Sequence, residues 1–329
     1  RGYQLARMIK AEFPESTLVF GGLHPTNLPE EVLAVPEIDY VVRGEGEEVM
    51  FKLYRAFRGD GDPTKIMGVS FIRNGILYNN PQSPLIPDLD QIPSFPYHLF
   101  EHPSYDKGFL TTSRGCPYRC SYCSIRTMTG VTYRYRSSEK IVEDIELLVN
   151  RYGQKSILFY DDNFCLNSRR VHELCDMLIE RKLHEKVEFS IQTRADNVLI
   201  YGGEPLVQHM AEAGFRYMQF GLETGVQRLA DLIRKDETVE CHLETADLCR
   251  KHGIKVTFLI IFGLPTETDD DRENSFQIVR KAKVSSTKYN NIIPYPGTPM
   301  WSELKDSNRV VVTKNWENFN SALAMSASI

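Results

Sequence analysis

The stretch "SRGCPYRCSYCSIR", residues 113–126, places three cysteines within eight positions, at Cys116, Cys120 and Cys123. A disulfide framework is disfavoured, because seven cysteines, an odd number with three crowded together, fit a reducing compartment better than a secreted one. Structural zinc usually takes four ligands in two pairs, and no second C-x-x-C or H-x-x-H occurs in the sequence. Three clustered thiolates suit an iron–sulfur cluster, since soft sulfur ligands match iron. Such a cluster either keeps one iron open for chemistry or only carries electrons, and structural zinc stays as an alternative.

The sequence after this loop alternates between strand-like and helical runs. Apolar runs typical of buried strands lie near residues 108–113, 156–161, 187–192, 216–221, 255–262 and 287–293. Helical patterns lie between them, near 138–151, 168–182, 204–213, 226–233, 239–252 and 268–283. Six strands that alternate with helices predict parallel crossover connections and a part-closed barrel. The other cysteines lie on or near these helices, where each is expected to be a small buried residue: Cys165, Cys175, Cys241 and Cys249.

Chemically capable side chains follow most of these predicted strands. In barrels of alternating strands and helices, the loops after the strands converge at one mouth, where reactions take place. The cysteine loop follows the first strand, and the later strands are followed by Asp161, Asp162 and Asn163, by Gln192 and Arg194, by Glu223, and by Gly263 and Glu267. The sequence therefore predicts that these groups collect around a single mouth.

The first 60 residues also alternate between helix and strand patterns. Helical patterns cover residues 2–11 and 47–58, and short apolar runs lie at 16–22 and 38–47. Two strands of the parallel type cannot bury a core alone, because such sheets are covered on both faces. The chain starts at Arg1 within a helical pattern and ends in "NSALAMSASI", so we interpret it as a fragment whose upstream part supplies the rest of the sheet.

A turn signal and a proline-rich stretch separate the two regions. "GVSFIRNGILYNN", residues 68–80, predicts a hairpin that turns at Asn74-Gly75. Residues 81–103 carry six prolines, which predict an extended linker. The predicted domains are an N-terminal domain with hairpin at 1–80, a linker at 81–106, a barrel at 107–300 and the start of a truncated C-terminal region at 301–329.

Composition describes an ordinary globular protein of 329 residues, with 42% hydrophobic and 25% charged residues. The formal net charge is −5, so no basic field indicates nucleic acid or an anionic membrane as a partner. The sequence has no run of 18 apolar residues and no apolar core of a signal peptide near its start. We therefore expect a cytoplasmic protein with neither a membrane nor a nucleic acid as partner.

The cysteine loop resembles the motif of radical S-adenosylmethionine (SAM) enzymes, C-x3-C-x-aromatic-C, with Tyr122 as the aromatic residue. The resemblance implies a [4Fe-4S] cluster on Cys116, Cys120 and Cys123 whose open iron binds SAM. Reductive cleavage of SAM then gives a 5′-deoxyadenosyl radical, which abstracts a hydrogen atom. The cofactors carry this chemistry while the protein positions and shields them. A reducing partner such as flavodoxin or ferredoxin is also implied.

The resemblance also implies SAM contacts at the strand ends: Tyr122, Asp161, Asp162, Gln192, Arg194, Glu223, Gly263 and Leu264. Alternatives stay open for several of them. Tyr122 could be a loop aromatic that packs on the barrel, and Glu223 could be a solvated helix cap. Arg194 could bind the SAM carboxylate as a fork or form a salt bridge with one of the two aspartates. Glu267 could simply cap the helix that follows it.

The segments "LVFGGLHPTNLPEEVL" and "IDYVVRGEGEE" resemble the C-terminal half of the Rossmann-like cobalamin-binding domain that precedes the barrel in one branch of this family. The implied fold is α/β, this half domain followed by a partial (β/α)6 barrel of the TIM type. Ligands of such sheets lie beyond the carboxyl ends of the strands. The implied cobalamin contacts are Gly21, Gly22, Leu23, His24, Gly44, Glu45 and Gly46, and tight turns without a ligand are the alternative.

His24 is not expected to be an axial cobalt ligand, because the run "HPT" suggests a turn and none of the eight histidines has Asp two residues before it. The resemblance favours a cobalamin-dependent radical SAM methyltransferase that acts on an unactivated carbon of a small-molecule substrate. Three alternatives remain: an anaerobic oxidative cyclase or another radical reaction of the same branch, a radical SAM enzyme without cobalamin, and a non-catalytic iron–sulfur module.

Overall fold

The computed structural model describes residues 1–100 and 102–306, so most of the predicted C-terminal region at 301–329 lies outside the described residues. The described chain forms two compact units. Of the described residues, the first unit comprises Arg1–Pro87, Ser121–Thr132 and 294–306, and the second comprises residues 88–100, 102–120 and Tyr133–Ile293. Each unit is described by itself.

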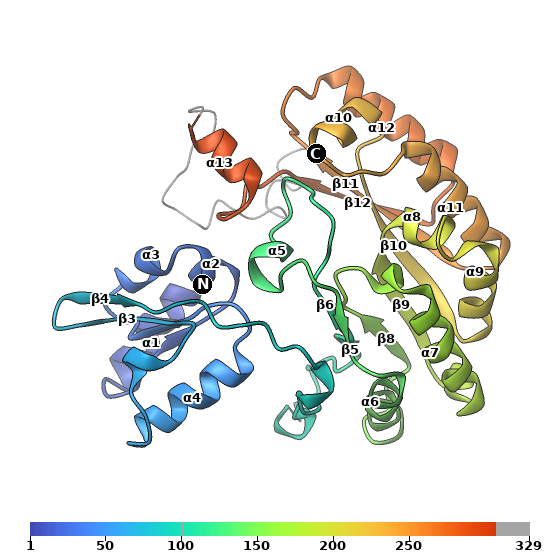
Figure 1. Cartoon of the computed structure of the whole chain (residues 1–329). Coiled ribbons are helices and arrows are strands. Elements are labelled where there is room, and N and C mark those ends of the chain that lie inside the picture. Colours follow the sequence, from blue (N-terminus) through green and yellow to red (C-terminus); the bar gives the residue numbers. More distant parts are fainter. Residues whose placement is uncertain (101, 307–329) are drawn as a thin grey trace. The chain divides into compact units, whose positions relative to one another are not determined.

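The second unit is built on a six-stranded sheet in the order β12-β11-β10-β9-β8-β5, with every neighbouring pair parallel (Figure 1). Within the described residues β5 and β12 are edge strands that do not pair with each other, so the sheet is an open barrel. This confirms the predicted part-closed barrel of parallel strands. The strands are β5 (Phe109–Leu110), β8 (Ser156–Phe159), β9 (Glu188–Thr193), β10 (Phe215–Glu223), β11 (Lys255–Phe262) and β12 (Ser286–Asn291).

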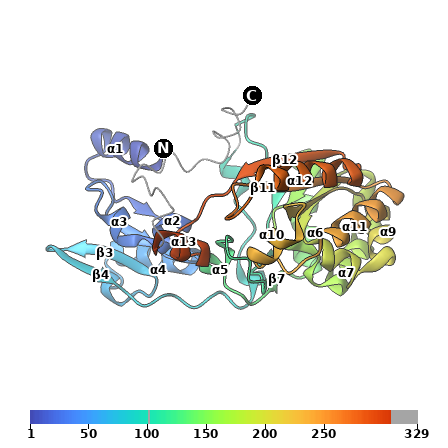
Figure 2. The same ribbon diagram turned by 90° about the horizontal axis from the view of Figure 1, so that it is seen from above.

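Helices cover one face of this sheet, as Figures 1 and 2 show. They are α6 (Ser138–Asn150), α7 (Ser168–Glu180), α8 (Ala195–Leu199), α9 (Gly203–Glu212), α10 (Gln227–Leu232), α11 (Val239–Lys251) and α12 (Asp269–Ala282). Side-chain caps fix where the long helices begin, with Ser137, Asn167, Thr238 and Thr268 each accepting a hydrogen bond from the first turn. The helices found between strands match the predicted ones except for α8, which the sequence analysis did not identify.

The main core lies between the helices and the sheet. Alternate residues of a strand face opposite sides of a sheet. In β9, Phe189 and Ile191 are buried in the core, whereas Ser190 and Gln192 belong to the other face. Phe159, Phe189 and Phe215 contact one another at the centre of this core. The side of the sheet opposite the helices is therefore free to carry polar groups.

A small antiparallel pair, β6 (Ser113–Arg114) and β7 (Arg134–Tyr135), brackets the cysteine loop in sequence. Short α5 (Ile125–Met128) lies within the bracketed stretch. The predicted linker is not fully extended, because two short 3-10 helices form there, Leu89–Gln91 and Tyr97–Leu99. Asp88 caps the first of them by accepting a hydrogen bond from the backbone N–H of Asp90.

The first unit contains a four-stranded sheet in the order β1-β2-β3-β4. Its strands are β1 (Val19–Phe20), β2 (Tyr40–Val42), β3 (Val69–Arg73) and β4 (Ile76–Asn79), and its helices are α1 (Gly2–Glu12), α2 (Leu23–Asn27), α3 (Pro29–Leu33), α4 (Glu47–Phe57) and α13 (Pro299–Asp306). The pair β1–β2 is parallel, and β3 and β4 form the predicted hairpin at Asn74-Gly75. Asn74 and Gly75 both adopt positive φ, the geometry of a tight hairpin turn.

Both faces of this smaller sheet are covered. Val41 packs with Ala6 and Val32 from α1 and α3, whereas the next residue, Val42, packs with Val49 of α4. This alternation along β2 is what a sheet between two helical layers requires. The predicted turn at "HPT" is wrong, because His24, Pro25 and Thr26 lie in α2, where proline is tolerated near the first turn.

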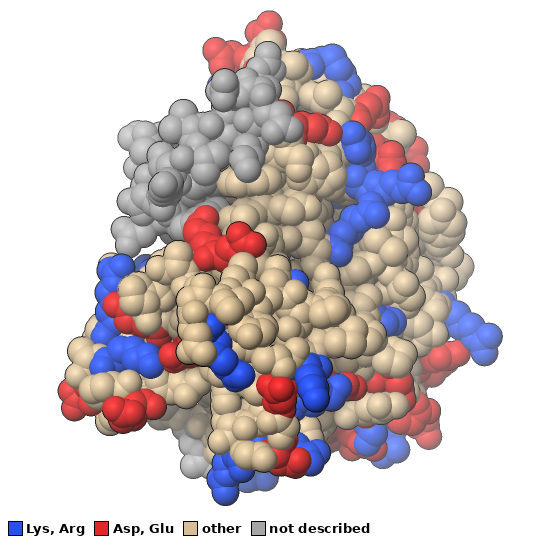
Figure 3. Space-filling model, turned by 60° about the vertical axis from the view of Figure 1, so that its left-hand side comes forward, with Lys and Arg blue, Asp and Glu red and all other residues tan. Residues whose placement is uncertain are grey.

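The surface carries both signs of charge. Figure 3 shows basic and acidic side chains interspersed with uncharged surface on the face in view. Neither sign forms a continuous area there, which agrees with the small net charge. Among the described residues no helix combines the length and the apolar character needed to cross a bilayer.

Candidate active site at the strand ends

The cysteine loop runs from β6 to α5 and holds three half-buried cysteines that form no disulfide, Cys116, Cys120 and Cys123. The four other cysteines are free and buried, as predicted. In the described residues no three Cys, His, Asp or Glu side chains are arranged as a metal site. The fit of the three thiols to a cluster rests on their donor chemistry, since thiolates are soft ligands for iron.

Charged side chains of both signs lie near the first two thiols. Burial raises the pKa of Cys116, while the backbone N–H of Tyr118 and the Arg194 guanidinium oppose this shift. Burial also raises the pKa of Cys120, and the charges of Lys235 and Arg194 oppose it. Cations near a thiol favour the thiolate, which is the form that binds metal. The nearby cations thus offset part of the effect of burial on these two thiols.

Asp161, which follows β8, is fully enclosed by the chain. Its Oδ1 accepts the backbone N–H groups of Thr112 at 2.6 Å and Ser113 at 3.1 Å. Its Oδ2 accepts the hydroxyl groups of the same two residues at 2.6 and 2.8 Å, and Arg170 Nη2 lies 3.8 Å away. A carboxylate has about four lone-pair sites, and all are used within the chain. Asp161 therefore holds the strand that leads into the cysteine loop.

Asp162 and Gln192 are placed differently. The Asp162 carboxylate accepts the backbone N–H of Gly115 at 3.3 Å, directly before Cys116. Asp162 is half-buried, and Gln192 is exposed on the face of β9 opposite the helices. Of the two aspartates, Asp161 is buried and Asp162 is half-buried.

Arg194 is the N-cap residue of α8 and is buried. Its guanidinium donates to both carboxylate oxygens of Asp196, at 3.0 and 2.8 Å, and to the carbonyl oxygens of Lys235 and Asp236, at 2.7 and 3.2 Å. The predicted salt bridge to an aspartate after β8 is wrong, because the partner is Asp196 in the next helix. Four hydrogen bonds occupy most of the five guanidinium N–H groups.

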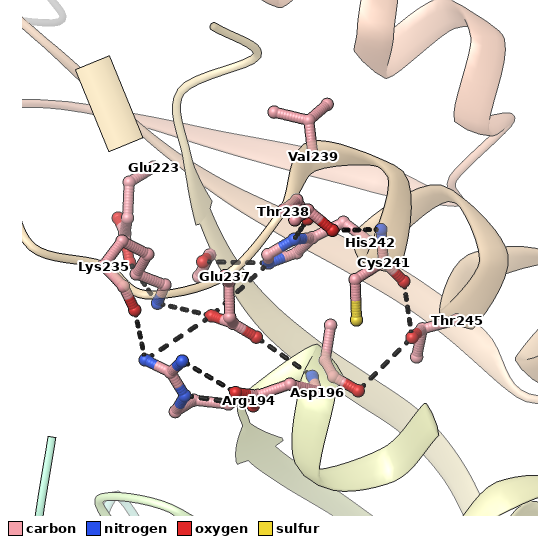
Figure 4. Close-up of polar contacts among 12 residues, drawn as sticks. Arg194, Asp196, Glu223, Lys235, Glu237, Thr238, Val239, Cys241, His242 and Thr245 are labelled. Carbon is pink, nitrogen blue, oxygen red and sulfur yellow. Dashed lines mark hydrogen bonds and ion pairs between the residues drawn. The ribbon is translucent and has the colours of Figure 1, made fainter. Parts of the chain in front are cut away.

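Lys235 lies at the centre of a buried ionic group, drawn in Figure 4. Its Nζ lies 3.4 Å from Glu223 Oε1 and 3.3 Å from Glu237 Oε2, and all three residues are less than 10% exposed. Burial lowers the pKa of Lys235, but the charges of Glu237 and Glu223 outweigh it, so the pKa is raised. Lys235 is therefore a permanent cation that links the ends of β10 and the α10–α11 connection.

Glu237 is the second centre of this group. Its Oε1 accepts the backbone N–H of Asp196 at 3.0 Å, and its Oε2 lies 3.7 Å from Arg194 Nη1. Burial raises the pKa of Glu237, but Lys235, His242 and Arg194 together lower it to about 2. Burial lowers the pKa of His242, whose Nε2 lies 3.2 Å from the carbonyl oxygen of Gly221. The Glu237 carboxylate is therefore ionised although it is buried.

Glu223 ends β10 in an unusual backbone conformation, with φ of 63°. The register of β10 against β11 shifts between Gly221 and Glu223, which marks an irregularity of the bulge type. The alternative of a solvated helix cap is wrong, because Glu223 is 7% exposed and the following helix is capped at Val226. Positive φ in a non-glycine residue at a strand end is common at functional sites.

The loop after β11 is held by a hydrogen bond between two of its own residues, Gly263 and Glu267. Gly263 has φ of 81°, and its backbone N–H donates to Glu267 Oε2 at 2.5 Å. The alternative that Glu267 caps the next helix is wrong, because Thr268 and Asp271 form the capping box of α12. Glu267 Oε1 is buried and has no hydrogen-bond partner among the described residues. The adjacent Leu264 is buried.

The predicted cobalamin contacts lie in two segments of the first unit, one around the start of α2 and one before α4. Gly22 has φ of 97°, and a Cβ atom built on it would meet nothing within 4 Å. Gly22 is exposed, and open space lies beside its backbone. His24 Nε2 lies 3.1 Å from Glu31 Oε1, and burial lowers the pKa of His24. Leu23 starts α2 beside it and is half-buried.

The second of these loops precedes α4. The backbone N–H of Gly44 donates to the hydroxyl of Thr26 at 3.0 Å, which joins the two loops. Glu45 is 9% exposed, and its Oε2 accepts the backbone N–H of Ile86 at 2.7 Å. Gly46 caps α4. The Glu45 side chain thus holds the start of the proline-rich stretch.

Sequence analysis missed several members of the buried ionic group. These are Asp196, Lys235, Glu237 and His242, with Tyr118 and Asn197 beside them. The run "RKDE" at 234–237 lies between two helical patterns, where charged residues are usually solvated. No local signal shows that Lys235 and Glu237 turn inward. Only the spacing Arg194-x-Asp196 could have suggested an ion pair.

Comparison with known proteins identifies the class. The model of the radical SAM superfamily matches residues 110–279, more than half of the chain. The chain therefore belongs to the radical SAM superfamily. The model of the B12 binding domain matches residues 3–53. The first match implies a [4Fe-4S] cluster and SAM as cofactors, and the second implies cobalamin.

Curated relatives cover most of the chain. An uncharacterized methyltransferase of Pyrococcus horikoshii is 30% identical over 323 residues, which is 96% of this chain and 69% of the relative. An anaerobic magnesium-protoporphyrin IX monomethyl ester cyclase of Cereibacter sphaeroides is 29% identical over 303 residues, 89% of this chain. The chain spans 49% of the length of that cyclase.

Solved structures share the fold. The radical SAM methyltransferase TsrM of Kitasatospora setae, with cobalamin and a [4Fe-4S] cluster bound, gives a TM-score of 0.80 at 21% identity. The match covers 95% of this chain and 63% of TsrM. The cobalamin-dependent radical enzyme OxsB gives a TM-score of 0.74 at 19% identity and covers 93% of this chain and 44% of OxsB.

Proposed function

We propose that this protein is a cobalamin-dependent radical SAM methyltransferase that methylates an unactivated carbon of a small molecule. The observation that carries the proposal is the conjunction of the cysteine loop at 113–126 with the B12-binding match at 3–53 in one chain. In this proposal the cluster and SAM supply a 5′-deoxyadenosyl radical and cobalamin transfers a methyl group. The protein supplies binding, orientation and a shielded site.

The cluster ligands are Cys116, Cys120 and Cys123 in this proposal. The SAM-binding residues are Tyr122, Asp162, Gln192, Glu223, Gly263 and Leu264. Asp161 and Arg194 hold the surrounding frame, because their hydrogen-bonding groups are largely used within the chain. Cobalamin is bound beside Gly21, Gly22, Leu23 and His24 and the loop of Gly44, Glu45 and Gly46.

A small-molecule substrate is supported by the solved structure of TsrM with tryptophan bound. The domain ranges proposed here are 1–80 for cobalamin, 81–106 as connector and 107–300 for the radical SAM core. Reduction of the cluster requires an electron donor, for which a flavodoxin or ferredoxin is suited. An oxidative cyclase is the second candidate, because the cyclase relative is 29% identical and the methyltransferase relative is 30% identical.

The test is product analysis after anaerobic reconstitution with iron, sulfide and cobalamin. The protein is incubated with SAM and a reductant, and 5′-deoxyadenosine and S-adenosylhomocysteine are quantified together. A methyltransferase forms both products, whereas a cyclase forms 5′-deoxyadenosine without S-adenosylhomocysteine. A protein that binds a cluster and forms neither product would be a non-catalytic module.

Cysteine variants provide the matched control for that experiment. Cys120→Ala is expected to lose labile sulfide and both products, because three thiolates are needed for three irons. Cys175→Ala is expected to keep both, since Cys175 is fully buried in the hydrophobic core. Zinc in place of iron, or full turnover by Cys120→Ala, would overturn the proposal.

A further inference from the structure

Tyr118 stands in the cysteine loop, two residues from Cys116 and two from Cys120, and it touches the barrel through both its ring and its hydroxyl group. The Arg194 guanidinium lies 3.5 Å from the centre of the Tyr118 ring. The Tyr118 hydroxyl donates to Asn197 Oδ1 at 2.7 Å. The ring is thus held at its face and at its tip by two residues that adjoin the end of β9.

The guanidinium over the ring cannot shift freely. Arg194 is 6% exposed and donates in a fork to Asp196, and its Nη1 donates to the carbonyl oxygen of Lys235 (Figure 4). Glu237 fixes Asp196 in turn, by accepting its backbone N–H at 3.0 Å. A planar guanidinium held this way offers a fixed face for stacking.

The acceptor at the tip of the ring is fixed as well. Asn197 is fully buried, and its Nδ2 donates to Asn163 Oδ1 at 2.9 Å. The Thr193 hydroxyl donates to the same oxygen at 2.8 Å. These bonds orient the Asn197 amide so that its oxygen faces Tyr118.

Tyr118 is the middle residue of the three that join Cys116 to Cys120. A protein sets the reduction potential of an iron–sulfur cluster through hydrogen bonds to the sulfur ligands and through nearby charges. A side chain that fixes this backbone therefore fixes the surroundings of a cluster ligand.

We propose that Tyr118 is a positioning residue for the cluster, which it serves by clamping the segment between Cys116 and Cys120 against Arg194 and Asn197. This inference rests on the proposed function, because it assumes a cluster on the cysteine loop. The buried ionic group then has a role beyond stability, because it holds the Arg194 guanidinium against which the Tyr118 ring packs.

The test compares Tyr118→Leu and Tyr118→Phe with Tyr217→Leu. Tyr217 is the matched control, because it also stacks with a cation, Lys255, at 5.1 Å from its ring, but at the exposed start of β10. Each protein is reconstituted anaerobically. The rate of iron release to a chelator is measured, as is the midpoint potential from a redox titration followed by electron paramagnetic resonance.

Tyr118→Leu is expected to release iron about tenfold faster and to lower the equilibrium constant for cluster reduction about tenfold, which is about 59 mV for one electron. Tyr118→Phe keeps the stacked ring and loses only the hydroxyl bond, so its values are expected between those of wild type and Tyr118→Leu. Tyr217→Leu is expected to match the wild type in both measurements.

Wild-type values in both Tyr118 variants would overturn the inference. If Tyr118→Leu does not fold, as judged by circular dichroism, the Tyr118→Phe result decides alone. Failure of the wild-type protein to hold iron and labile sulfide would instead overturn the proposed function, so the two failures are distinguishable.

Discussion

The carboxylate of Asp161 accepts both the backbone N–H and the hydroxyl of Thr112, each at 2.6 Å. These bonds join the end of β8 to the segment after β5, directly before the cysteine loop. The loop therefore starts from a fixed point of the barrel. Further along the loop, Tyr118 is held by its contacts with Arg194 and Asn197.

Asp161→Ala is expected to lower the free energy of unfolding by about 2–4 kcal/mol, because it leaves buried donors of Thr112 and Ser113 without an acceptor and Arg170 without its ion pair. Urea denaturation followed by circular dichroism measures this. Asp247→Ala is the control, since the Asp247 side chain is 64% exposed and, among the described residues, its ion pair is with Arg250 on the same helix. The control should change the free energy by less than about 1 kcal/mol. Equal effects of the two variants would contradict the assigned role.

Lys235→Met is expected to destabilise the protein by about 3–5 kcal/mol, because two buried carboxylates, Glu223 and Glu237, lose their shared cation. Lys251→Met serves as control, since its ion pair with Glu204 is exposed. Adding Glu223→Gln to Lys235→Met should recover part of the loss, which a double-mutant cycle in urea measures. Strict additivity of the two changes would show that Lys235 and Glu223 do not interact.

Stability is expected to fall in acid through Glu237. The pKa of Glu237 is lowered to about 2 in the folded protein, against an ordinary value of 4.5. A lowered pKa means that the contribution is present above pH 4.5 and is lost as the pH falls toward 2. The free energy of unfolding, measured by urea titrations between pH 5 and pH 2, should drop more steeply in wild type than in Glu237→Gln. Equally steep profiles would exclude Glu237 as the source.

Glu223→Gln is expected to weaken SAM binding about tenfold, or about 1.4 kcal/mol, without loss of iron. The reason is that Glu223 ends β10 at the mouth, close to Lys235 and within the charged surroundings of Cys120. Glutamine keeps the size of the side chain while it removes the charge. Equilibrium binding of SAM to the reconstituted protein measures the effect, and an unchanged affinity would remove Glu223 from the proposed site.

The cysteine loop and the alternating pattern could be identified from the sequence because both are local. The spacing of Cys116, Cys120 and Cys123 is a covalent property of the chain, and apolar periodicity records which face of each strand and helix is buried. For the same reason, the helices from 138 to 283 were predicted within a few residues, and so was the hairpin at Asn74-Gly75. Short α8 was missed, because five residues are too few to establish a helical period.

The sequence by itself determined the class of cofactor donors and the order of strands and helices along the chain. Only the tertiary structure decided the partners of the charged residues, such as Arg194 with Asp196 and Lys235 with Glu223 and Glu237. The physical reason is that a charged side chain is equally compatible with solvent or with a buried partner until the fold removes water from one side. Burial of a charge depends on residues distant in sequence, and no local pattern encodes it.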